Sequence, residues 1–277
     1  MNEEPCYIDT HAHVQMAEFD ADRKDVLQRC WDSGVGWIVC PGVDIATSDR
    51  AGQLAEQEAG VLAAVGVHPE DCADAPSDYL ERLRALVSRY REKAVAIGEI
   101  GLDFKEGTPD HVLQIRCFEE QLQLAADLRL PVIVHSRFAV ADCLSAISHL
   151  DGLRGVMHCF GGSPLEVGRA VGMGLCVSFT GNITYPGAHA SRDALKSCPV
   201  ERLLLETDSP YMPPVPKRGM RNEPSFVVHT YEAAASLLDM DVFGLGHRIE
   251  KTARELFIQH ERREDAGEED IQNCAQS

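Results

Sequence analysis

The sequence predicts an α/β fold, a TIM (β/α)8 barrel formed by one domain. The length of 277 residues suits this fold, which typically takes roughly 250 residues. Short apolar runs recur along the chain, and each is followed by an amphipathic stretch. Several runs end on a His, Glu or Asp, and TIM barrels carry their functional residues at the carboxyl ends of their strands. Together these observations favour a barrel over an open sheet.

Eight runs can be counted as expected strands. They lie near residues 6–10, 36–41, 61–67, 94–100, 131–135, 155–159, 175–179 and 202–206. The interval between successive runs leaves room for a helix and two loops. This is the pattern of right-handed βαβ crossovers in a parallel sheet.

The intervening stretches contain signals for the start of helices. Ser77 precedes apolar residues at helical spacing, so we expect it to be an N-cap. Thr108 and Pro109 predict a second N-cap, with proline at the first helical position. Ser163 and Glu166 have the spacing of a capping box at the start of a third helix.

Composition indicates a globular protein with an acidic surface. Hydrophobic residues make up 44% of the chain, enough for a sizeable core, and the net charge is −18. That charge argues against binding nucleic acid through a broad basic surface. We expect residues 1–260 to form the barrel domain, and residues 261–277, with six acids and two arginines, to form a flexible solvated tail.

The ten cysteines are scattered and include no C-x-x-C pair, and Cys40, Cys159 and Cys176 lie inside apolar runs. They are expected to be reduced and buried. The chain begins without an apolar signal region and has no run of 18 apolar residues. We therefore expect an intracellular protein of the cytoplasm or nucleus, neither secreted nor membrane-bound. We also expect a monomer.

The first run ends in Asp9-Thr10-His11-Ala12-His13. Alternate side chains of a strand lie on the same face. His11 and His13 can therefore bind one cation from a single strand end, with Asp9 as a further ligand or as a partner of the ligands. A histidine after an apolar run is, taken singly, more often a hydrogen-bonded core or turn residue.

The same feature recurs at other strand ends, which favours a metal centre over coincidence. The residues concerned are Glu99, His135, His158 and Asp208, with His68 as a less certain addition. Mixed histidine and carboxylate ligands suit Zn²⁺, Mn²⁺ or Mg²⁺ better than a metal that prefers thiolates.

Taken in order, the motifs resemble the TatD family of metal-dependent deoxyribonucleases. They are Asp9-Thr10-His11-Ala12-His13, Gly98-Glu99-Ile100-Gly101-Leu102-Asp103, His135-Ser136-Arg137, His158-Cys159-Phe160, Glu206-Thr207-Asp208-Ser209-Pro210-Tyr211, Val215-Pro216-Lys217-Arg218-Gly219 and Arg221-Asn222-Glu223-Pro224. The match runs from residue 7 to about residue 258. Residues 104–107 depart from the tyrosine-rich, longer loop that is common in the family.

The resemblance implies a binuclear site on a barrel of the metal-dependent hydrolase type. His11, His13, Glu99 and Asp208 would surround one divalent ion, and Glu99, His135 and His158 the other, with Glu99 as a bridge. Two such ions, Mg²⁺, Mn²⁺ or Zn²⁺, stabilise charge on the oxygens of a phosphodiester during hydrolysis.

Asp208 and Glu99 are the candidate catalytic residues. We expect Asp208 to act as the general base that accepts the proton of the attacking water. The alternative is that Asp208 only binds metal. Glu206 would share a strand face with Asp208 and could support it, whereas Asp103 could fasten a loop through backbone N–H groups.

Substrate contacts are expected from a proline-stiffened loop that follows Asp208. Its cations Lys217, Arg218 and Arg221 are candidates for binding phosphates near the metals. The alternative is a solvated turn or ion pairs with Glu223. His68 and Arg137 are further candidates for substrate binding, with structural roles as their alternatives.

The expected function is hydrolysis of DNA phosphodiester bonds at strand ends or abasic sites. The resemblance implies a 3′-exonuclease, with cleavage at abasic sites as a further activity. One alternative is a binuclear hydrolase of a small-molecule or RNA-linked ester or amide. The other is a metal-binding adaptor protein without enzymatic activity.

Overall fold

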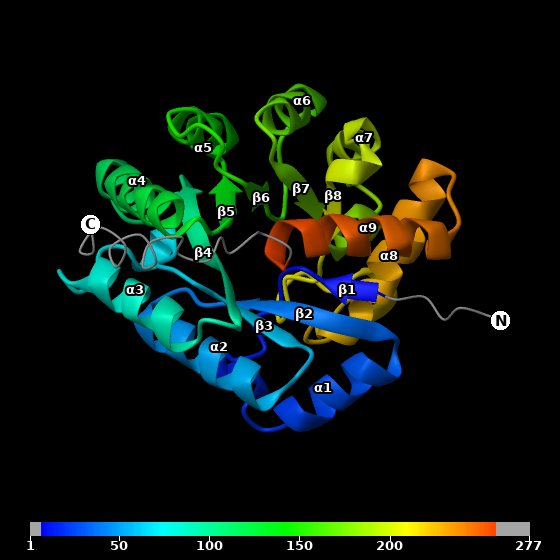
Figure 1. Cartoon of the computed structure of the whole chain (residues 1–277). Helices are drawn as coiled ribbons and strands as arrows, with labels where there is room; N and C mark the ends of the chain where they lie inside the picture. Colours follow the sequence, from blue (N-terminus) through cyan, green and yellow to red (C-terminus); the bar gives the residue numbers. More distant parts are fainter. Residues whose placement is uncertain (1–6, 259–277) are drawn as a thin grey trace, which may run out of the picture.

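A computed structural model describes residues 7–258 of the chain. Eight parallel strands form one sheet in sequence order, and each pairs with the next. Helices lie outside the strands and alternate with them (Figure 1). The strands are β1 (Tyr7–Asp9), β2 (Val35–Pro41), β3 (Val61–Val65), β4 (Ala94–Asp103), β5 (Val132–Arg137), β6 (Gly155–Met157), β7 (Cys176–Phe179) and β8 (Leu203–Leu205). The predicted TIM barrel is confirmed, with each expected strand overlapping an observed one.

The barrel closes between β8 and β1 through the residues that follow these two strands. The Thr10 amide donates to the Leu205 carbonyl at 3.3 Å, and the Asp208 amide donates to the His11 carbonyl at 2.9 Å. The amide of His13 donates to the Ser209 carbonyl at 2.8 Å. The two chain segments that contain His11, His13 and Asp208 are therefore fixed against each other by backbone hydrogen bonds.

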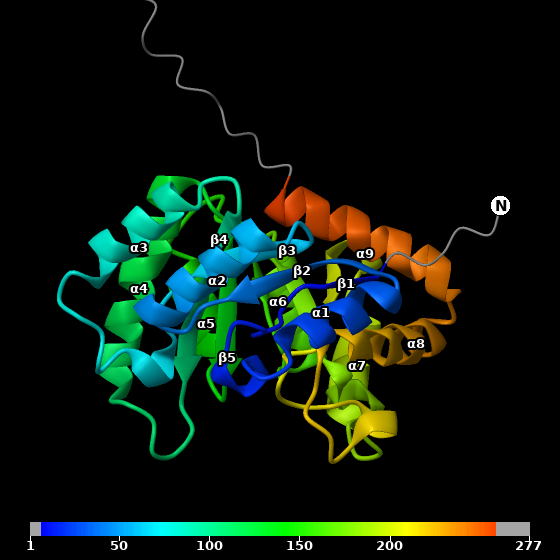
Figure 2. The same ribbon diagram turned by 90° about the horizontal axis from the view of Figure 1, so that it is seen from below.

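The helices surround the barrel in sequence order, and α8 and α9 lie together beside β1 (Figure 2). The α-helices are α1 (Arg23–Asp32), α2 (Ile45–Gln57), α3 (Tyr79–Arg89), α4 (His111–Leu128), α5 (Val140–Ile147), α6 (Pro164–Gly172), α7 (His189–Ser197), α8 (Val227–Leu238) and α9 (Val242–Phe257). Short 3₁₀ helices are η1 (Ala17–Phe19), η2 (Pro69–Asp71), η3 (Gly181–Thr184), η4 (Val200–Arg202), η5 (Val215–Lys217) and η6 (Pro224–Phe226).

One of the three predicted caps is confirmed, and two are wrong by one or two residues. Ser163 and Glu166 form the capping box of α6. The residue before α3 is Asp78 rather than Ser77. Asp110 caps α4, because its Oδ1 accepts from two backbone amides of the first turn, whereas the Thr108 hydroxyl donates to the Asp103 carbonyl at 2.8 Å. In α4 the helix start shifted because Thr108 holds the preceding loop.

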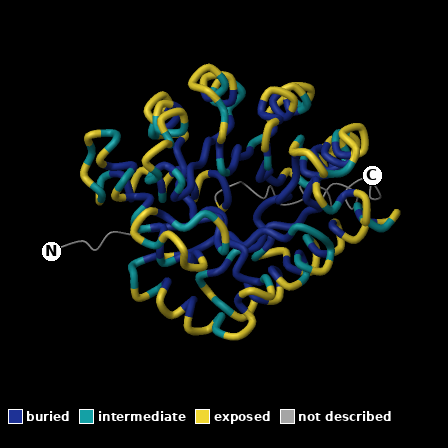
Figure 3. Tube along the Cα trace, turned by 180° about the vertical axis from the view of Figure 1, so that it is seen from behind, coloured by how far each residue is buried: buried dark blue, intermediate teal, exposed yellow. Residues whose placement is uncertain are grey.

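The core fills the barrel and the layer between strands and helices (Figure 3). All ten residues of β4 are buried, as expected for a parallel strand that is covered on both faces. The cysteines in the described range are unpaired, and of these only Cys159 is partly exposed. Within residues 7–258, no helix combines the length and the apolar character needed to cross a bilayer. The predicted tail at 261–277 lies outside the described residues.

Candidate metal centre

Glu99 projects from the long strand β4, and two glycines allow it to do so. A Cβ on Gly98 would lie 2.7 Å from Cβ of Ile133, and Gly101 has φ +141° with no room for a Cβ beside the His135 carbonyl. The register between β4 and β5 shifts between Ile97 and Ile100. The G-E-I-G motif thus lets β4 lie against β5 while the Glu99 side chain reaches the barrel mouth.

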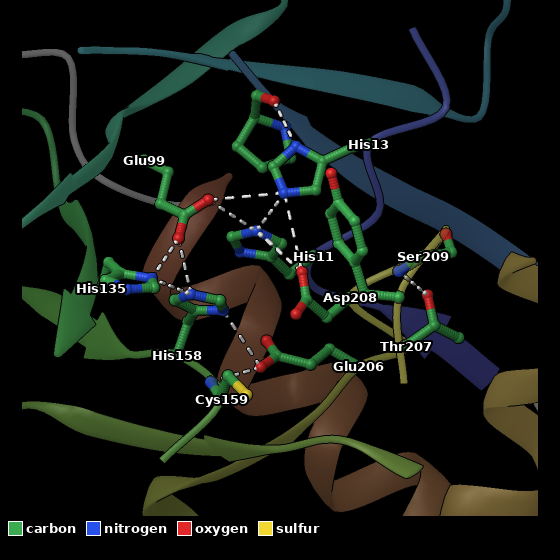
Figure 4. Close-up of polar contacts among 12 residues, drawn as sticks. His11, His13, Glu99, His135, His158, Cys159, Glu206, Thr207, Asp208 and Ser209 are labelled. Atoms are coloured by element: carbon green, nitrogen blue, oxygen red, sulfur yellow. Dashed lines mark hydrogen bonds and ion pairs between the residues drawn. The ribbon is translucent and has the colours of Figure 1, made fainter. Parts of the chain in front are cut away.

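The two carboxylate oxygens of Glu99 each face a pair of histidines (Figure 4). Oε2 lies 3.2 Å from Nε2 of His11 and 3.4 Å from Nε2 of His13. Oε1 lies 2.7 Å from Nε2 of His158 and 2.8 Å from Nδ1 of His135. Glu99 is 3% exposed, so four imidazoles and one carboxylate share a space with little water.

Three of these histidines place their outer ring nitrogen against an acceptor. His13 Nδ1 lies 3.0 Å from the Pro41 carbonyl oxygen, and His135 Nε2 lies 3.0 Å from Asp103 Oδ2. His158 Nδ1 lies 3.4 Å from Glu206 Oε1. Carbonyl and carboxylate oxygens only accept, so the outer nitrogens of His13 and His135 donate, whereas His158 Nδ1 lies near Glu206 without a hydrogen bond. The inner nitrogen of a neutral ring then presents its lone pair to Glu99.

This arrangement fits divalent metal ions. The lone pair of a ring nitrogen repels a carboxylate oxygen that it faces, unless a proton or a cation lies between the two atoms. Where two ring nitrogens face the same oxygen, a cation that both can bind is favoured over a proton. Nε2 of His11 lies 3.0 Å from Nε2 of His13, too close for both to be protonated. The carbonyl or carboxylate behind three rings is the usual support of a metal-binding imidazole. Three groups that could hold an ion are His11, His158 and Asp208; His11, His13 and Glu99; and His68, Glu99 and His135.

Asp208 follows β8 and reaches the same centre. Its Oδ1 lies 3.6 Å from Nε2 of His13 and 3.8 Å from Nε2 of His11. Burial by itself raises the pKa of the Asp208 carboxyl, but the polar contact with His13 and the electrostatic effect of His11 and His158 outweigh this and lower the pKa. Asp208 is therefore ionised at neutral pH, as a metal ligand or a base must be.

Glu99 is likewise ionised, although it is buried. Burial raises its pKa, yet the neighbouring histidines, above all His158 and then His11, outweigh this and hold the pKa well below the ordinary value. The carboxylate that faces all the histidines thus keeps its charge, which is the requirement for a bridging ligand.

His68 lies closer to the centre than the sequence indicated. Its Nε2 is 3.6 Å from Glu99 Oε1, and its ring contacts that of His135 with centroids 4.4 Å apart. Burial lowers the pKa of His68 to about 3, so the ring is neutral. His68 was predicted to bind substrate, and the structure places it where it could also bind metal.

Asp9 has a structural role and is not part of the centre. Its Oδ1 accepts from the Thr207 amide at 2.9 Å and from the His11 amide at 3.2 Å, and its Oδ2 accepts from the Thr207 hydroxyl. Both oxygens thus accept from residues that follow β1 and β8. Of the two roles expected for Asp9, a further ligand or a partner of the ligands, the contacts fit the second, because its side chain binds the His11 amide and ties the two strand ends together.

Glu206 and Asp103, weakly indicated by sequence, support the histidines. Besides facing His158, Glu206 accepts from the Cys159 amide at 2.6 Å. Asp103 accepts from the Lys105 amide at 3.0 Å, as predicted for a loop fastener, and also holds His135 and Arg137. The sequence signal for Glu206 was its position two residues before Asp208, on the same strand face.

A cavity of about 880 Å³ opens over the centre. Its lining includes His13, His68, Glu99, His135, His158 and Asp208, together with Lys105, Arg137, Phe138 and Tyr211. Arg137 lies at its edge, where its guanidinium binds Asp103 and Glu70. Lys105 and Phe138 were not among the predicted site residues.

Contrary to expectation, the cations of the basic loop do not face the centre. Lys217, Arg218 and Arg221 are absent from the cavity lining. Lys217 lies over the ring of Phe226 and Arg218 over that of Tyr185. The Arg221 guanidinium binds Asp22 at 2.7 Å. These side chains thus contact neighbouring aromatic and acidic groups. None of the three forms an ion pair with Glu223 within residues 7–258, where Glu223 binds Arg29.

Residues 8–258 match the family model described as TatD related DNase. The chain belongs to the TatD family. Among TatD-family relatives, an uncharacterized metal-dependent hydrolase, YabD of Bacillus subtilis, is 35% identical over 90% of this chain and 98% of its own length. The 3′-5′ ssDNA/RNA exonuclease TatD of Pantoea vagans is 35% identical over the same shares.

A solved structure agrees with this assignment. The crystal structure of YjjV, a TatD homologue from Escherichia coli K12, superposes with a TM-score of 0.86 at 33% identity and covers 91% of this chain and 97% of that one. This TatD-family chain is therefore a metal-dependent hydrolase on a TIM barrel.

Proposed function

We propose that this protein is a 3′-exonuclease that hydrolyses phosphodiester bonds of single-stranded DNA with two divalent metal ions. The observation that carries the proposal is the position of Glu99, whose two oxygens each face a separate pair of histidines. A carboxylate with two such pairs is suited to bridge two ions. Relatives named as 3′-5′ ssDNA/RNA exonucleases support the choice of substrate and polarity.

The proposed ligands are His11, His13, Glu99 and Asp208 for one ion and Glu99, His135 and His158 for the other. His68 is an additional candidate for the second ion, from its distance to Glu99. The ions would supply Lewis-acid stabilisation of negative charge on the phosphate.

The chain itself supplies the proton acceptor and a rigid frame. Asp208 is ionised, and its carboxylate can orient the attacking water and take its proton. Glu206, Asp103 and the Pro41 carbonyl hold the histidine rings in one orientation. Closure of the strand ends by Asp9 keeps Asp208 aligned with His11.

Defined DNA ends test the proposal. Single strands labelled at the 5′ end, with a 3′-hydroxyl or a blocked 3′ end, are incubated with the full chain and Mg²⁺, Mn²⁺ or Zn²⁺. A ladder that shortens from the free 3′ end, and that chelation abolishes, is the expected result. Absence of cleavage with every metal would refute the proposal. Duplexes with one abasic site test the second activity, cleavage at that site.

A second candidate function is hydrolysis of a small-molecule or RNA-linked ester. The cavity lining favours it, because Glu70, Asp71, Asp142 and Glu166 are acidic and would repel a polyanion. A panel of small esters and amides, assayed beside single-stranded DNA with each metal, separates the two. Turnover of esters without any DNA cleavage would establish the second function.

A further inference from the structure

Phe138 is an exposed aromatic residue at the rim of the cavity. It follows Arg137, the last residue of β5, and lines the space over the candidate metal centre. Its side chain is 78% exposed, so the ring contributes little to the core. Tyr211, the other Tyr or Phe in the lining, differs because its ring faces His13 and its hydroxyl contacts Met16.

The backbone at this position disfavours a phenylalanine. Phe138 has φ +57°, in the left-handed region, where glycine and asparagine are tolerated and a bulky side chain is strained. The ring does not offset this strain by burial. Neither packing nor local conformation therefore explains an aromatic residue here, and strained residues at cavity rims often serve binding.

The charged residues around the cavity attract a DNA strand only weakly, so its binding requires another interaction. The acidic residues Glu70, Asp71, Asp142 and Glu166 line it. Of the two cations in the lining, Arg137 is bound by Asp103 and Glu70, and Lys105 makes no ion pair with any residue in the range 7–258. With one available cation, phosphate attraction alone is weak.

We propose that the Phe138 ring is a stacking platform for an unpaired nucleobase of the strand that enters the cavity. This inference rests on the proposed function and specifies how the same site holds its substrate. Stacking on an aromatic ring needs no charge, accepts every base and requires that the base be unpaired. Phe138 would thus select single strands over duplexes, and Lys105 would contact the adjacent phosphate.

Three variants of the full chain test the platform. F138N removes the ring and suits the left-handed backbone, so it should fold at least as stably as the parent. F138W keeps an aromatic surface and adds an exposed indole. F243A is the matched control, because Phe243 is 44% exposed on α9 and is absent from the cavity lining.

Binding of short dye-labelled single strands is measured by fluorescence anisotropy in the presence of chelator, where no cleavage occurs. F138N should weaken binding by about 5-fold to 100-fold, the range of base stacking on one aromatic side chain. F138W should bind at least as well as the parent, with its fluorescence quenched by the stacked base. F243A should bind like the parent.

A base-free phosphodiester separates this inference from the proposed function. Binding of a single strand made only of abasic deoxyribose phosphates, measured by the same anisotropy assay, should be equal in F138N and the parent, within about 2-fold, because such a strand has no base to stack on Phe138. If the parent cleaves single-stranded DNA and F138N binds and cleaves it equally well, the platform is refuted while the exonuclease stands. If the parent neither binds nor cleaves any single-stranded nucleic acid, the proposed function is refuted, and the stacking platform that rests on it is refuted as well.

Discussion

Replacing Asp208 by Asn separates metal binding from proton transfer at the centre. The amide keeps the shape and one ligand oxygen, which lies 3.6 Å from Nε2 of His13 in the carboxylate form. It cannot accept a proton from water. General-base assistance is worth about 10² to 10⁴ in rate, so kcat should fall by at least about 100-fold.

Loss of the Asp208 charge also weakens the nearby ion. Two unit charges about 4 Å apart interact by about 4 kcal/mol at an effective dielectric constant of about 20, and a divalent ion doubles this to about 8 kcal/mol, which sets an upper scale for the weaker binding. The assay is therefore run at saturating Mn²⁺, with bound metal measured by elemental analysis in the same samples. Cleavage of a labelled DNA 3′ end gives kcat and KM.

The matched control for D208N is D239N. Asp239 has φ +53° beside +56° for Asp208 and is exposed at the end of α8, away from the centre. D239N should keep full activity, whereas D208N should retain metal, a KM within a few-fold of the parent, and very little turnover. If D208N cleaves the DNA end within a few-fold of the parent, Asp208 is not the base.

Three further predictions follow from the same contacts. Glu99→Ala should remove both metal ions together, and elemental analysis that still finds two ions per chain would contradict a bridge. Arg221→Ala should lower the melting temperature through its lost bond to Asp22 and leave DNA binding and its salt dependence unchanged, as titration at several salt concentrations would show. Glu223→Gln should cost about 1 kcal/mol at pH 7, because it breaks the bond with half-exposed Arg29. Burial raises the pKa of Glu223, but the bond from Arg29 outweighs this, so the folded-state pKa is lowered. The stabilisation is present above the ordinary pKa of Glu223 and is lost as the pH falls through its lowered value. Denaturant unfolding of parent and variant should therefore converge as the pH falls below the ordinary pKa of Glu223.

The strands were predictable because a parallel barrel buries both faces of each one. Continuous apolar runs such as β4 follow from that burial and can be read without any tertiary contact. The start of α4 was not predictable, because the Thr108 hydroxyl donates to the Asp103 carbonyl instead of capping the helix. Local propensity allows either use of a threonine, and only the neighbouring loop decides between them.

The candidate centre was largely visible in the sequence for a topological reason. The carboxyl ends of parallel strands meet at one mouth, so polar residues at those ends converge wherever the barrel closes. His11, Glu99, His158 and Asp208 do converge, as their distances show. The two-residue spacing at the end of β1 indicated His11 and His13 as metal ligands. It allowed the same role for Asp9, because alternate residues of a strand share a face whatever their function.

The amino-acid sequence by itself determined the order of strands, the closed barrel and the residues brought to its mouth, since these depend on periodicity and on position in the chain. The tertiary structure decided which acceptors stand behind each histidine, that Asp9 joins β1 to β8, and that Arg221 binds Asp22 rather than facing the cavity. It also placed Phe138 and Lys105 at the rim. The physical reason is that side-chain direction and hydrogen-bond partners are set by contacts between segments far apart in sequence, which periodicity does not encode.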